Sequence, residues 1–191
     1  RLLGDLDPAL LGTISTETEE FLKPATTLAN RRSVPYLWGL TVLAGRSEVL
    51  RGLEPSWELL WREDLNIAVL DEPSDLIWLA LLALGHDPAT ATKDQIDEAA
   101  ARIEQRFPKL TMHMKDLNSG LDALEAGDVD LVITYNGDAL IRAARNPSID
   151  VVLPKEGAPL WMDSFALTRE ARSPRLAQEF IRFMTSPEVS A

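Results

Sequence analysis

The stretch Ile67-Ala68-Val69-Leu70-Asp71-Glu72-Pro73-Ser74-Asp75 carries the clearest structural signal in the chain. Its first four residues form an apolar run of strand length. Residues 71–75 are typical of a helix start, with Pro in the first turn and carboxylates on either side of it. The helix expected over residues 73–84 ends at Gly85 and is apolar on nearly every side. We therefore predict a strand that leads directly into a helix packed between other elements.

Working outward from this stretch, the same alternation of strand and helix continues to the end of the chain. The elements expected after residue 85, read from hydrophobic periodicity, are helices at 93–107, 121–126, 138–145 and 174–184, and strands at 111–114, 129–134, 149–153 and 160–167. Such alternation indicates an α/β fold with a mainly parallel sheet flanked by helices. The first thirty residues are poorly periodic, and we expect only one or two short helices there.

One of these helices has a well-defined apolar stripe. In the helix expected at 93–107, apolar residues recur at the spacing i, i+3, i+4, i+7 and i+11, at Ile96, Ala99, Ala100, Ile103 and Phe107. Pro108 ends the pattern. The opposite face is polar, so we expect this helix to pack with one side only.

Composition and charge exclude several classes of function. The 191 residues include 30 Asp and Glu against 19 Lys and Arg, a formal net charge of −11, which disfavours a nucleic-acid partner and suits a cationic ligand. The chain contains no cysteine, which excludes disulfides, thiol nucleophiles and Cys-ligated metals. The longest unbroken apolar run, Leu76 to Leu84, is too short to span a bilayer. The start has neither Met nor the pattern of a signal peptide, so we expect a processed, trimmed or excerpted chain.

Sequence motifs of common enzymes and metal sites are absent. The chain has no G-x-S-x-G, no G-x-x-x-x-G-K-[ST], no G-x-G-x-x-G and no H-E-x-x-H. The two histidines, His86 and His113, are far apart in sequence, and we expect surface or packing roles for both. We therefore predict no catalytic residues, no metal and no cofactor.

Acidic and aromatic residues gather where predicted strands begin or end. Glu72 and Asp75 follow one strand, Tyr135 follows another, and Trp161 and Asp163 lie around a third. Ligands of open α/β sheets bind at such strand ends. An amine ligand needs this mixture, because carboxylates accept the ammonium protons and aromatic faces hold both its charge and its methylenes.

Each of these residues also has an ordinary structural explanation. Asp75 can cap its helix, and Glu72 can lie favourably near the positive end of the helix dipole. Trp161 can pack in a core or an interface, Asp163 can bond a backbone amide, and Tyr135 can belong to a turn. The prediction of a ligand site depends on all five meeting at one sheet edge.

At these residues the chain resembles the spermidine/putrescine-binding proteins of bacterial ABC importers, a branch of the periplasmic solute-binding proteins. The order and spacing of the matching segments make the resemblance specific, and it covers nearly the whole chain. The segments are SVPYLWG (33–39), SWELLW (56–61), DEPSD (71–75), ALG (83–85), GDVDL (127–131), YNGDA (135–139), PKEG (154–157) and WMDSFA (161–166).

The resemblance implies a periplasmic-binding-protein-like fold of the class II type, with two α/β lobes joined by hinge strands. Residues 1–38 would be a partial first-lobe segment and hinge, 39–161 the second lobe, and 162–191 the return hinge and a further first-lobe segment. Members of the family are longer, so on this resemblance we expect the start of the first lobe and the final segment to be missing. The implied protein is a monomeric periplasmic or lipid-anchored receptor that delivers a polyamine to an ABC permease. It would contact the membrane only through the permease or the anchor.

The resemblance also implies a role for each residue of the predicted site. Trp161 would stack along the polyamine methylenes and Asp163 would bind an amine, while Glu72 and Asp75 would receive the other end. Tyr135 would form an aromatic wall, at a position where the family usually has Trp. By contrast, we assign Trp57, in the segment SWELLW, to packing.

Three other functions remain open from the residues alone. A receptor of the same fold could bind another solute. The five residues include no Arg or Lys, which disfavours an anionic solute. A lobe of this fold could serve as an interaction or sensor module without a ligand. A hydrolase could use Asp75 and Asp163 as acid and base, but nothing in the sequence marks these carboxylates as reactive.

Overall fold

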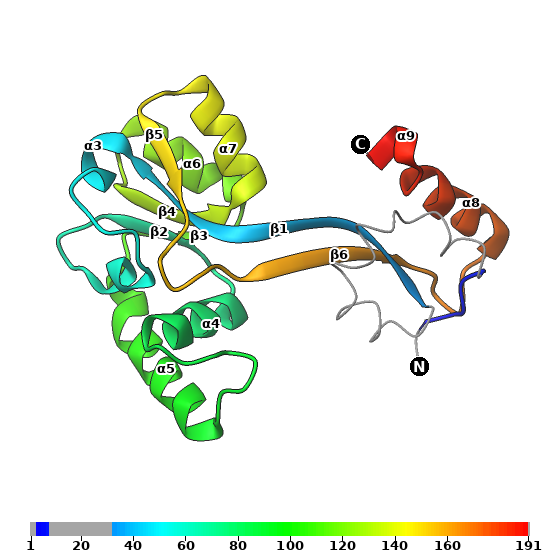
Figure 1. The fold of residues 1–191 in the computed structure, drawn as a ribbon, viewed down its shortest axis with the longest axis horizontal. Coiled ribbons are helices and arrows are strands. Elements are labelled where there is room, and N and C mark those ends of the chain that lie inside the picture. The colour runs from blue at the N-terminus through cyan, green and yellow to red at the C-terminus, as the bar shows by residue number, and fades with distance from the viewer. Residues whose placement is uncertain (1–2, 8–31, 191) are drawn as a thin grey trace. The chain divides into compact units, whose positions relative to one another are not determined.

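The computed structural model describes residues 3–7 and 32–190. The chain divides into two compact units, one formed by Gly39–Leu160 and the other by Arg1–Trp38 together with Trp161–Ala191. It passes between the units in strand β1 (Ser33–Arg46) and at the start of strand β6 (Leu160–Ala166), and these two strands pair with each other (Figure 1). The interpretation of these segments as hinge and lobes of a receptor stays a prediction.

A mixed sheet forms the centre of the unit Gly39–Leu160. Its remaining strands are β2 (Ile67–Leu70), β3 (Met112–Met114), β4 (Leu131–Tyr135) and β5 (Ile149–Val152), and the spatial order is β3-β2-β4-β1-β5. Strand β2 is parallel to β3 and to β4, whereas β1 is antiparallel to β4 and to β5. The α/β fold with a mainly parallel sheet is confirmed, and β1 is an antiparallel strand within it that the sequence analysis does not predict.

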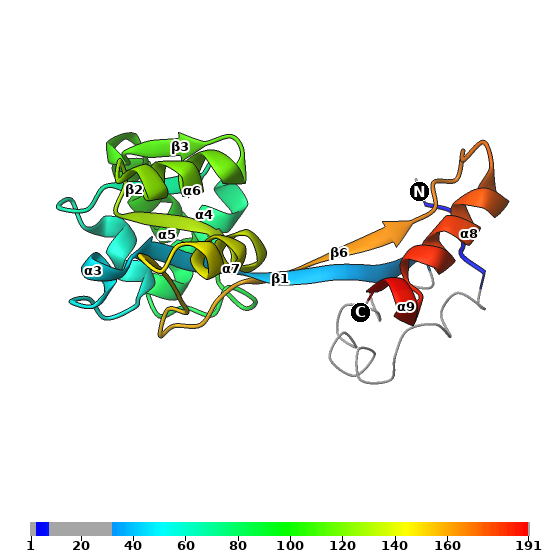
Figure 2. The same cartoon turned by 90° about the horizontal axis from the view of Figure 1, so that it is seen from above.

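Helices cover both faces of this sheet (Figure 2). They are α3 (Ser47–Leu50), α4 (Pro73–Ala83), α5 (Lys93–Arg106), α6 (Leu117–Ala126) and α7 (Asn136–Arg145), with the 3-10 turns η1 (Trp57–Trp61) and η2 (Phe107–Lys109). Side chains alternate along the strands. For example, Ile133 packs in one core with α4 and η1, and its neighbour Val132 packs in a second core with α6 and α7.

The predicted helix after β2 is confirmed, with one difference in its burial. Helix α4 ends next to Gly85, whose positive φ of 76° is the left-handed conformation that glycine adopts readily. Leu79 of this helix faces the sheet core, and Ala80 packs instead against Ala99 of α5. Trp78, however, is 43% exposed, so the prediction of a helix packed between other elements is wrong at that position.

Helix α6 begins four residues earlier than predicted. Asp116 caps it, since its side chain accepts a hydrogen bond of 2.9 Å from the backbone N–H of Ser119. Gly120 faces Met114 so closely that an added Cβ would lie 1.8 Å from the Met sulfur. The run Asn118-Ser119-Gly120 has low helix propensity, which explains why the pattern alone misses this turn.

The unit made of the two chain ends has a small core of its own. Strands β1 and β6 contribute Val34 and Phe165, and helix α8 (Pro174–Met184) contributes Ile181, with the short helix α9 (Pro187–Ser190) following it. The ring of Phe165 lies 4.5 Å from that of Tyr36 and 5.9 Å from that of Phe180, centroid to centroid. The short helices expected in the first thirty residues fall almost entirely on residues 8–31, outside the described residues.

Neither a membrane-spanning helix nor a metal site is found among the residues that the structure describes. Within residues 3–7 and 32–190, no helix is both long and apolar enough to cross a membrane. The same residues contain no group of three or more His, Asp or Glu side chains that could hold a metal ion.

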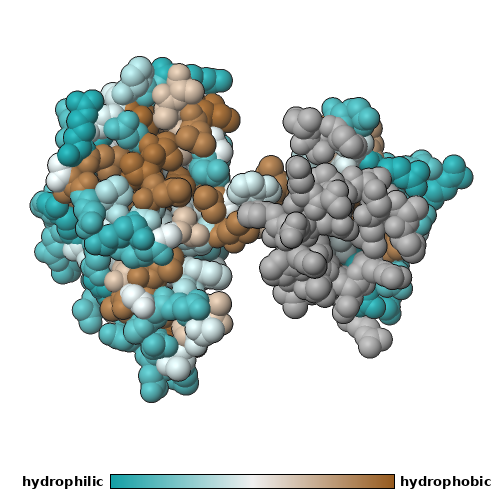
Figure 3. Space-filling view, in the orientation of Figure 1, coloured by the Kyte–Doolittle hydropathy of each residue, from teal (hydrophilic) through white to brown (hydrophobic). Residues whose placement is uncertain are grey.

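Apolar residues gather in the middle of one face of the Gly39–Leu160 unit, with hydrophilic residues around them (Figure 3).

Candidate functional site

The site is formed at the carboxyl ends of two neighbouring parallel strands. Strand β2 leads into Asp71 and Glu72 at the start of α4, and β4 leads into Tyr135 at the start of α7. Because β2 and β4 are parallel, with Val69 paired to Ile133, these carboxyl ends lie at the same edge of the sheet. The backbone therefore places the acidic and aromatic groups of the two turns side by side.

Glu72 is the N-cap residue of α4, but its side chain makes no capping hydrogen bond. Only the backbone of Glu72 takes part in the helix start, because its carbonyl accepts a hydrogen bond of 3.1 Å from the N–H of Leu76. The side chain of Glu72 is exposed. Its carboxylate is thus not used for capping, which removes one structural explanation for an acidic residue at this position.

Asp75, one turn further along α4, is half-buried and lines a small cavity with Thr41 and Tyr135. Burial and the charge of Glu72 raise the pKa of the Asp75 carboxyl, while a hydrogen bond from the Tyr135 hydroxyl acts in the opposite direction. The cavity measures about 10 Å³, room for roughly one water molecule. The Asp75 carboxylate is thus a charge held close to another negative charge, an arrangement that a cation would stabilise.

Strand β1 completes this edge of the sheet. Thr41 pairs with Tyr135 across the antiparallel ladder, and its side chain is only 3% exposed. The side-chain oxygen of Asn136 accepts a hydrogen bond of 2.9 Å from the N–H of Leu40, which fixes the start of α7 against β1. Sequence reasoning misses Thr41, because only the register between β1 and β4 reveals it.

The five predicted site residues fall into two groups. Glu72, Asp75 and Tyr135 are brought together in the unit Gly39–Leu160. Trp161 and Asp163 belong to the other compact unit, two positions apart on β6 and therefore on the same face of that strand. Trp161 is half-buried and Asp163 is exposed. A shared site for all five residues stays a prediction, and nothing in the structure tests the alternative of a hydrolase that uses Asp75 and Asp163.

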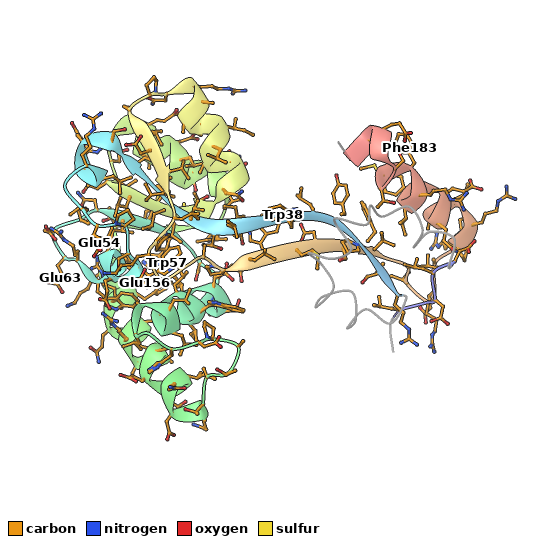
Figure 4. All side chains as sticks on the ribbon, viewed as in Figure 1. Trp38, Glu54, Trp57, Glu63, Glu156 and Phe183 are labelled. Atoms are coloured by element: carbon orange, nitrogen blue, oxygen red, sulfur yellow. The ribbon has the colours of Figure 1, made fainter. Side chains whose placement is uncertain are left out.

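Another carboxylate of the Gly39–Leu160 unit, that of Glu156, has a structural role. The Glu156 carboxylate accepts hydrogen bonds from the Ser56 hydroxyl and from the N–H of Trp57, the latter at 3.1 Å. The Trp57 indole N–H donates to the carbonyl of Gly157 at 2.8 Å, and Trp57 is fully buried (Figure 4). The segments SWELLW and PKEG thus bind each other, and the assignment of Trp57 to packing is confirmed.

Both histidines have the packing or surface surroundings that we expect. The Nδ1 atom of His86 lies 3.1 Å from the side-chain amide nitrogen of Gln95, and its Nε2 atom lies 3.5 Å from the carboxylate of Glu98. The ring therefore connects the segment after α4 to α5. The exposed His113 ring packs edge-on against Phe107, with a centroid distance of 4.1 Å.

Comparison with known proteins gives one consistent family. Residues 2–191 match the family described as bacterial extracellular solute-binding protein. The spermidine/putrescine-binding periplasmic protein of Salmonella typhimurium is 28% identical over 195 residues, which cover 99% of this chain and 55% of that protein. A putrescine-binding periplasmic protein of Pseudomonas aeruginosa, SpuD, is 26% identical over 85% of this chain and 49% of that protein. The chain thus spans about half the length of these curated relatives.

Solved structures agree in fold. The putative spermidine/putrescine ABC transporter from Listeria monocytogenes superposes with a TM-score of 0.84 at 25% identity, covering 99% of this chain and 59% of that one. The Tp0655 lipoprotein of Treponema pallidum superposes with a TM-score of 0.83 at 22% identity, covering 98% and 60%. The periplasmic-binding-protein fold is thereby confirmed.

Proposed function

Because this chain belongs to the family of bacterial extracellular solute-binding proteins, we propose that it captures a polyamine such as spermidine or putrescine for an ABC importer. The activity is binding alone, with no bond made or broken and no cofactor. Relatives whose names specify spermidine or putrescine support the choice of ligand. The single observation that carries the proposal is the carboxylate pair of Glu72 and Asp75 beside the Tyr135 ring.

The electrostatics of this pair favour a primary ammonium ion. The charge of Glu72 and the burial of Asp75 both oppose ionisation of Asp75, so a cation placed beside them relieves an unfavourable interaction that exists before binding. An ammonium group donates three hydrogen bonds, and carboxylates accept them with charge assistance. Tyr135 adds a ring that attracts a cation and packs against methylenes. The net charge of −11 draws cations toward the chain from a distance.

The remaining parts of the proposal concern the second unit and the partner. Trp161 and Asp163 would take the other end of the polyamine, Trp161 along the methylenes and Asp163 at an amine. The two units would close on the ligand by bending at β1 and β6, and an ABC permease would recognise the closed form. The location would be outside the cytoplasm, periplasmic or lipid-anchored, in line with the names of the relatives.

A calorimetric titration of the chain with spermidine, putrescine and acetate tests the proposal. We expect heat of binding with both polyamines and none with acetate. Charge-assisted hydrogen bonds of about 1.5–3 kcal/mol each are available from the Glu72 and Asp75 groups, and a ring contact adds about 1 kcal/mol. Ordering costs reduce that sum, and we expect a dissociation constant on the order of 0.1–1 mM.

Matched variants locate the binding site. Glu72→Gln and Asp75→Asn each remove one carboxylate of the pair and are expected to weaken polyamine binding about tenfold. Asp128→Asn removes an exposed carboxylate elsewhere in the same unit and is expected to leave binding unchanged. Equal losses in all three variants would mean that only net charge matters. Binding of acetate in preference to polyamines would overturn the proposal.

A further inference from the structure

A groove between helices α4 and α5 is distinct from the carboxylate pair described above. Helices α4 and α5 pack side by side, and η2 continues the chain beyond α5 (Figure 1). The groove has a volume of about 250 Å³. Its walls are Pro73, Leu76, Ile77, Ala100, Ile103 and Phe107, and Asp71 and Glu104 complete the lining.

Part of the apolar stripe at Ile96, Ala99, Ala100, Ile103 and Phe107 lines the groove. Ala99 of that stripe is fully buried against α4, whereas Ala100, Ile103 and Phe107 remain half-buried and line the groove. Ala100 and Ile103 lie one turn apart on one side of α5, and Phe107, the first residue of η2, extends that side four residues later. Packing against α4 therefore accounts for only part of the stripe, and the rest forms an apolar wall.

The two carboxylates of the groove differ from those of Glu58 and Glu63, which lie in and just after η1 and face basic residues of α5 and η2. Arg102 of α5 pairs with Glu58 at 2.6 Å, and Lys109 of η2 pairs with Glu63 at 2.8 Å, so the charges of these pairs are balanced. Asp71 and Glu104 are exposed, and neither carboxylate forms a hydrogen bond or ion pair with any residue that the structure describes. An apolar groove with two carboxylates that have no partner among the described residues suits an apolar body with one ammonium group, because that group can donate hydrogen bonds to both carboxylates.

From this complementarity we propose that the groove between α4 and α5 binds a small organic cation made of one primary ammonium group on an apolar body. A cavity of about 150 Å³ holds benzene, so about 250 Å³ accommodates a phenyl ring with a two-carbon arm. The ring would contact Ile103 and Phe107, and the ammonium group would donate to Asp71 and Glu104. A polyamine lacks such a body, so this ligand class differs from that of the Glu72 and Asp75 pair.

Titration with 2-phenylethylammonium, followed by NMR of isoleucine methyl groups, tests the proposal. We expect the methyl resonances of Ile77 and Ile103 to shift in a saturable way, and those of Ile149, which packs on the other face of the sheet, to stay in place. The same ring with a neutral or negative arm, in 2-phenylethanol and 3-phenylpropionate, is expected to bind at least about fivefold more weakly. Equal affinity for all three probes, or shifts confined to the neighbourhood of Tyr135, would overturn the proposal.

Variants separate the charge from the shape of the groove. Glu104→Gln is expected to weaken binding of 2-phenylethylammonium about three- to tenfold. The control Asp94→Asn removes an equal charge ten residues earlier on the same helix, roughly 15 Å away, and is expected to have no effect. Ala100→Phe fills the groove and is expected to abolish the shifts of Ile77 and Ile103. If that variant fails to fold by circular dichroism, the Glu104→Gln and Asp94→Asn pair decides the question, and equal affinities in that pair would contradict the proposal.

The groove and the polyamine site can fail independently. Asp75→Asn is expected to weaken polyamine binding and to leave binding of 2-phenylethylammonium unchanged. Glu104→Gln is expected to do the reverse. Loss of both activities in both variants would show a single site and would contradict the assignment of the groove.

Discussion

Two carboxylates of the Gly39–Leu160 unit, those of Glu156 and Glu72, differ in the hydrogen bonds that the fold supplies to them. Glu156 is bonded to the Ser56 hydroxyl and to the N–H of Trp57, which joins two chain segments about a hundred residues apart. The side chain of Glu72 makes no capping hydrogen bond. The pKa of its neighbour Asp75 is raised mainly by burial and, as a second cause, by the charge of Glu72. A carboxylate supplied with internal donors stabilises the fold, whereas one without them is available to a ligand.

The largest expected effect is on the structural side of this comparison. Trp57→Ala removes a fully buried indole and its hydrogen bond to Gly157, and is expected to lower the free energy of unfolding by about 3–5 kcal/mol. Chemical denaturation measures this loss. The control Trp78→Ala, at a side chain 43% exposed, is expected to cost less than about 1 kcal/mol. Similar losses in the two variants would mean that Trp57 does not hold the two segments together.

A smaller effect is expected when each of these two carboxylates, Glu156 and Glu72, is neutralised in turn. Glu156→Gln weakens the acceptor for Ser56 and Trp57, and is expected to lower the free energy of unfolding by about 1–3 kcal/mol while leaving polyamine affinity unchanged. Glu72→Gln is expected to do the opposite, with stability within about 0.5 kcal/mol of the parent chain and weaker binding. Denaturation and calorimetry on both variants test this crossed pattern. A polyamine affinity that is lowered by Glu156→Gln and not by Glu72→Gln would contradict this pattern.

The smallest expected effect is on the pH dependence of stability. Burial and the charge of Glu72 raise the pKa of Asp75, so the folded chain holds this proton more tightly than the unfolded chain does. The contribution of Asp75 to stability is therefore fully present below the ordinary pKa of Asp, and it is lost as the pH rises through the raised value. Asp75→Asn is expected to stabilise the chain at pH 7, by less than about 1 kcal/mol, and to have no effect near pH 3.

Thermal unfolding at the two pH values measures this difference. Asp130 supplies a contrast of opposite sign, because burial raises the pKa of its carboxyl but hydrogen bonds from Asn66 and Arg46 outweigh that effect and lower it. Asp130→Asn is accordingly expected to destabilise the chain at pH 7, and this loss is expected to shrink as the pH falls below the ordinary pKa of Asp and through the lowered one. A loss of stability in Asp75→Asn at pH 7 would show that Asp75 has a structural role like that of Asp130.

The parts of the fold that the sequence predicts are those with local signals. Strand β2 and helix α4 are recognisable because an apolar run, a proline start and Gly85 as a stop follow one another within twenty residues. Strand β1 carries no comparable signal, because its residues Ser33–Arg46 mix exposed and buried positions without regular alternation. Its antiparallel direction in the sheet is a tertiary property that local periodicity does not contain.

The same distinction applies to the site. Glu72, Asp75 and Tyr135 are predictable, because residues that follow parallel strands reach one edge of the sheet. Thr41 is not, since it reaches that edge only through its pairing with Tyr135 in the antiparallel ladder. The bond between Ser56 and Glu156 is equally hidden, because nothing in either segment specifies a partner a hundred residues away.

The central claim is that a primary ammonium group binds between Glu72 and Asp75. The most direct test is to follow the side-chain carboxyl carbon of Asp75 by NMR during a pH titration, with and without saturating putrescine. The account predicts that putrescine lowers the pKa of Asp75 from its raised value, because a bound cation stabilises the charged carboxylate. An Asp75 pKa that stays the same when putrescine is bound would contradict the claim.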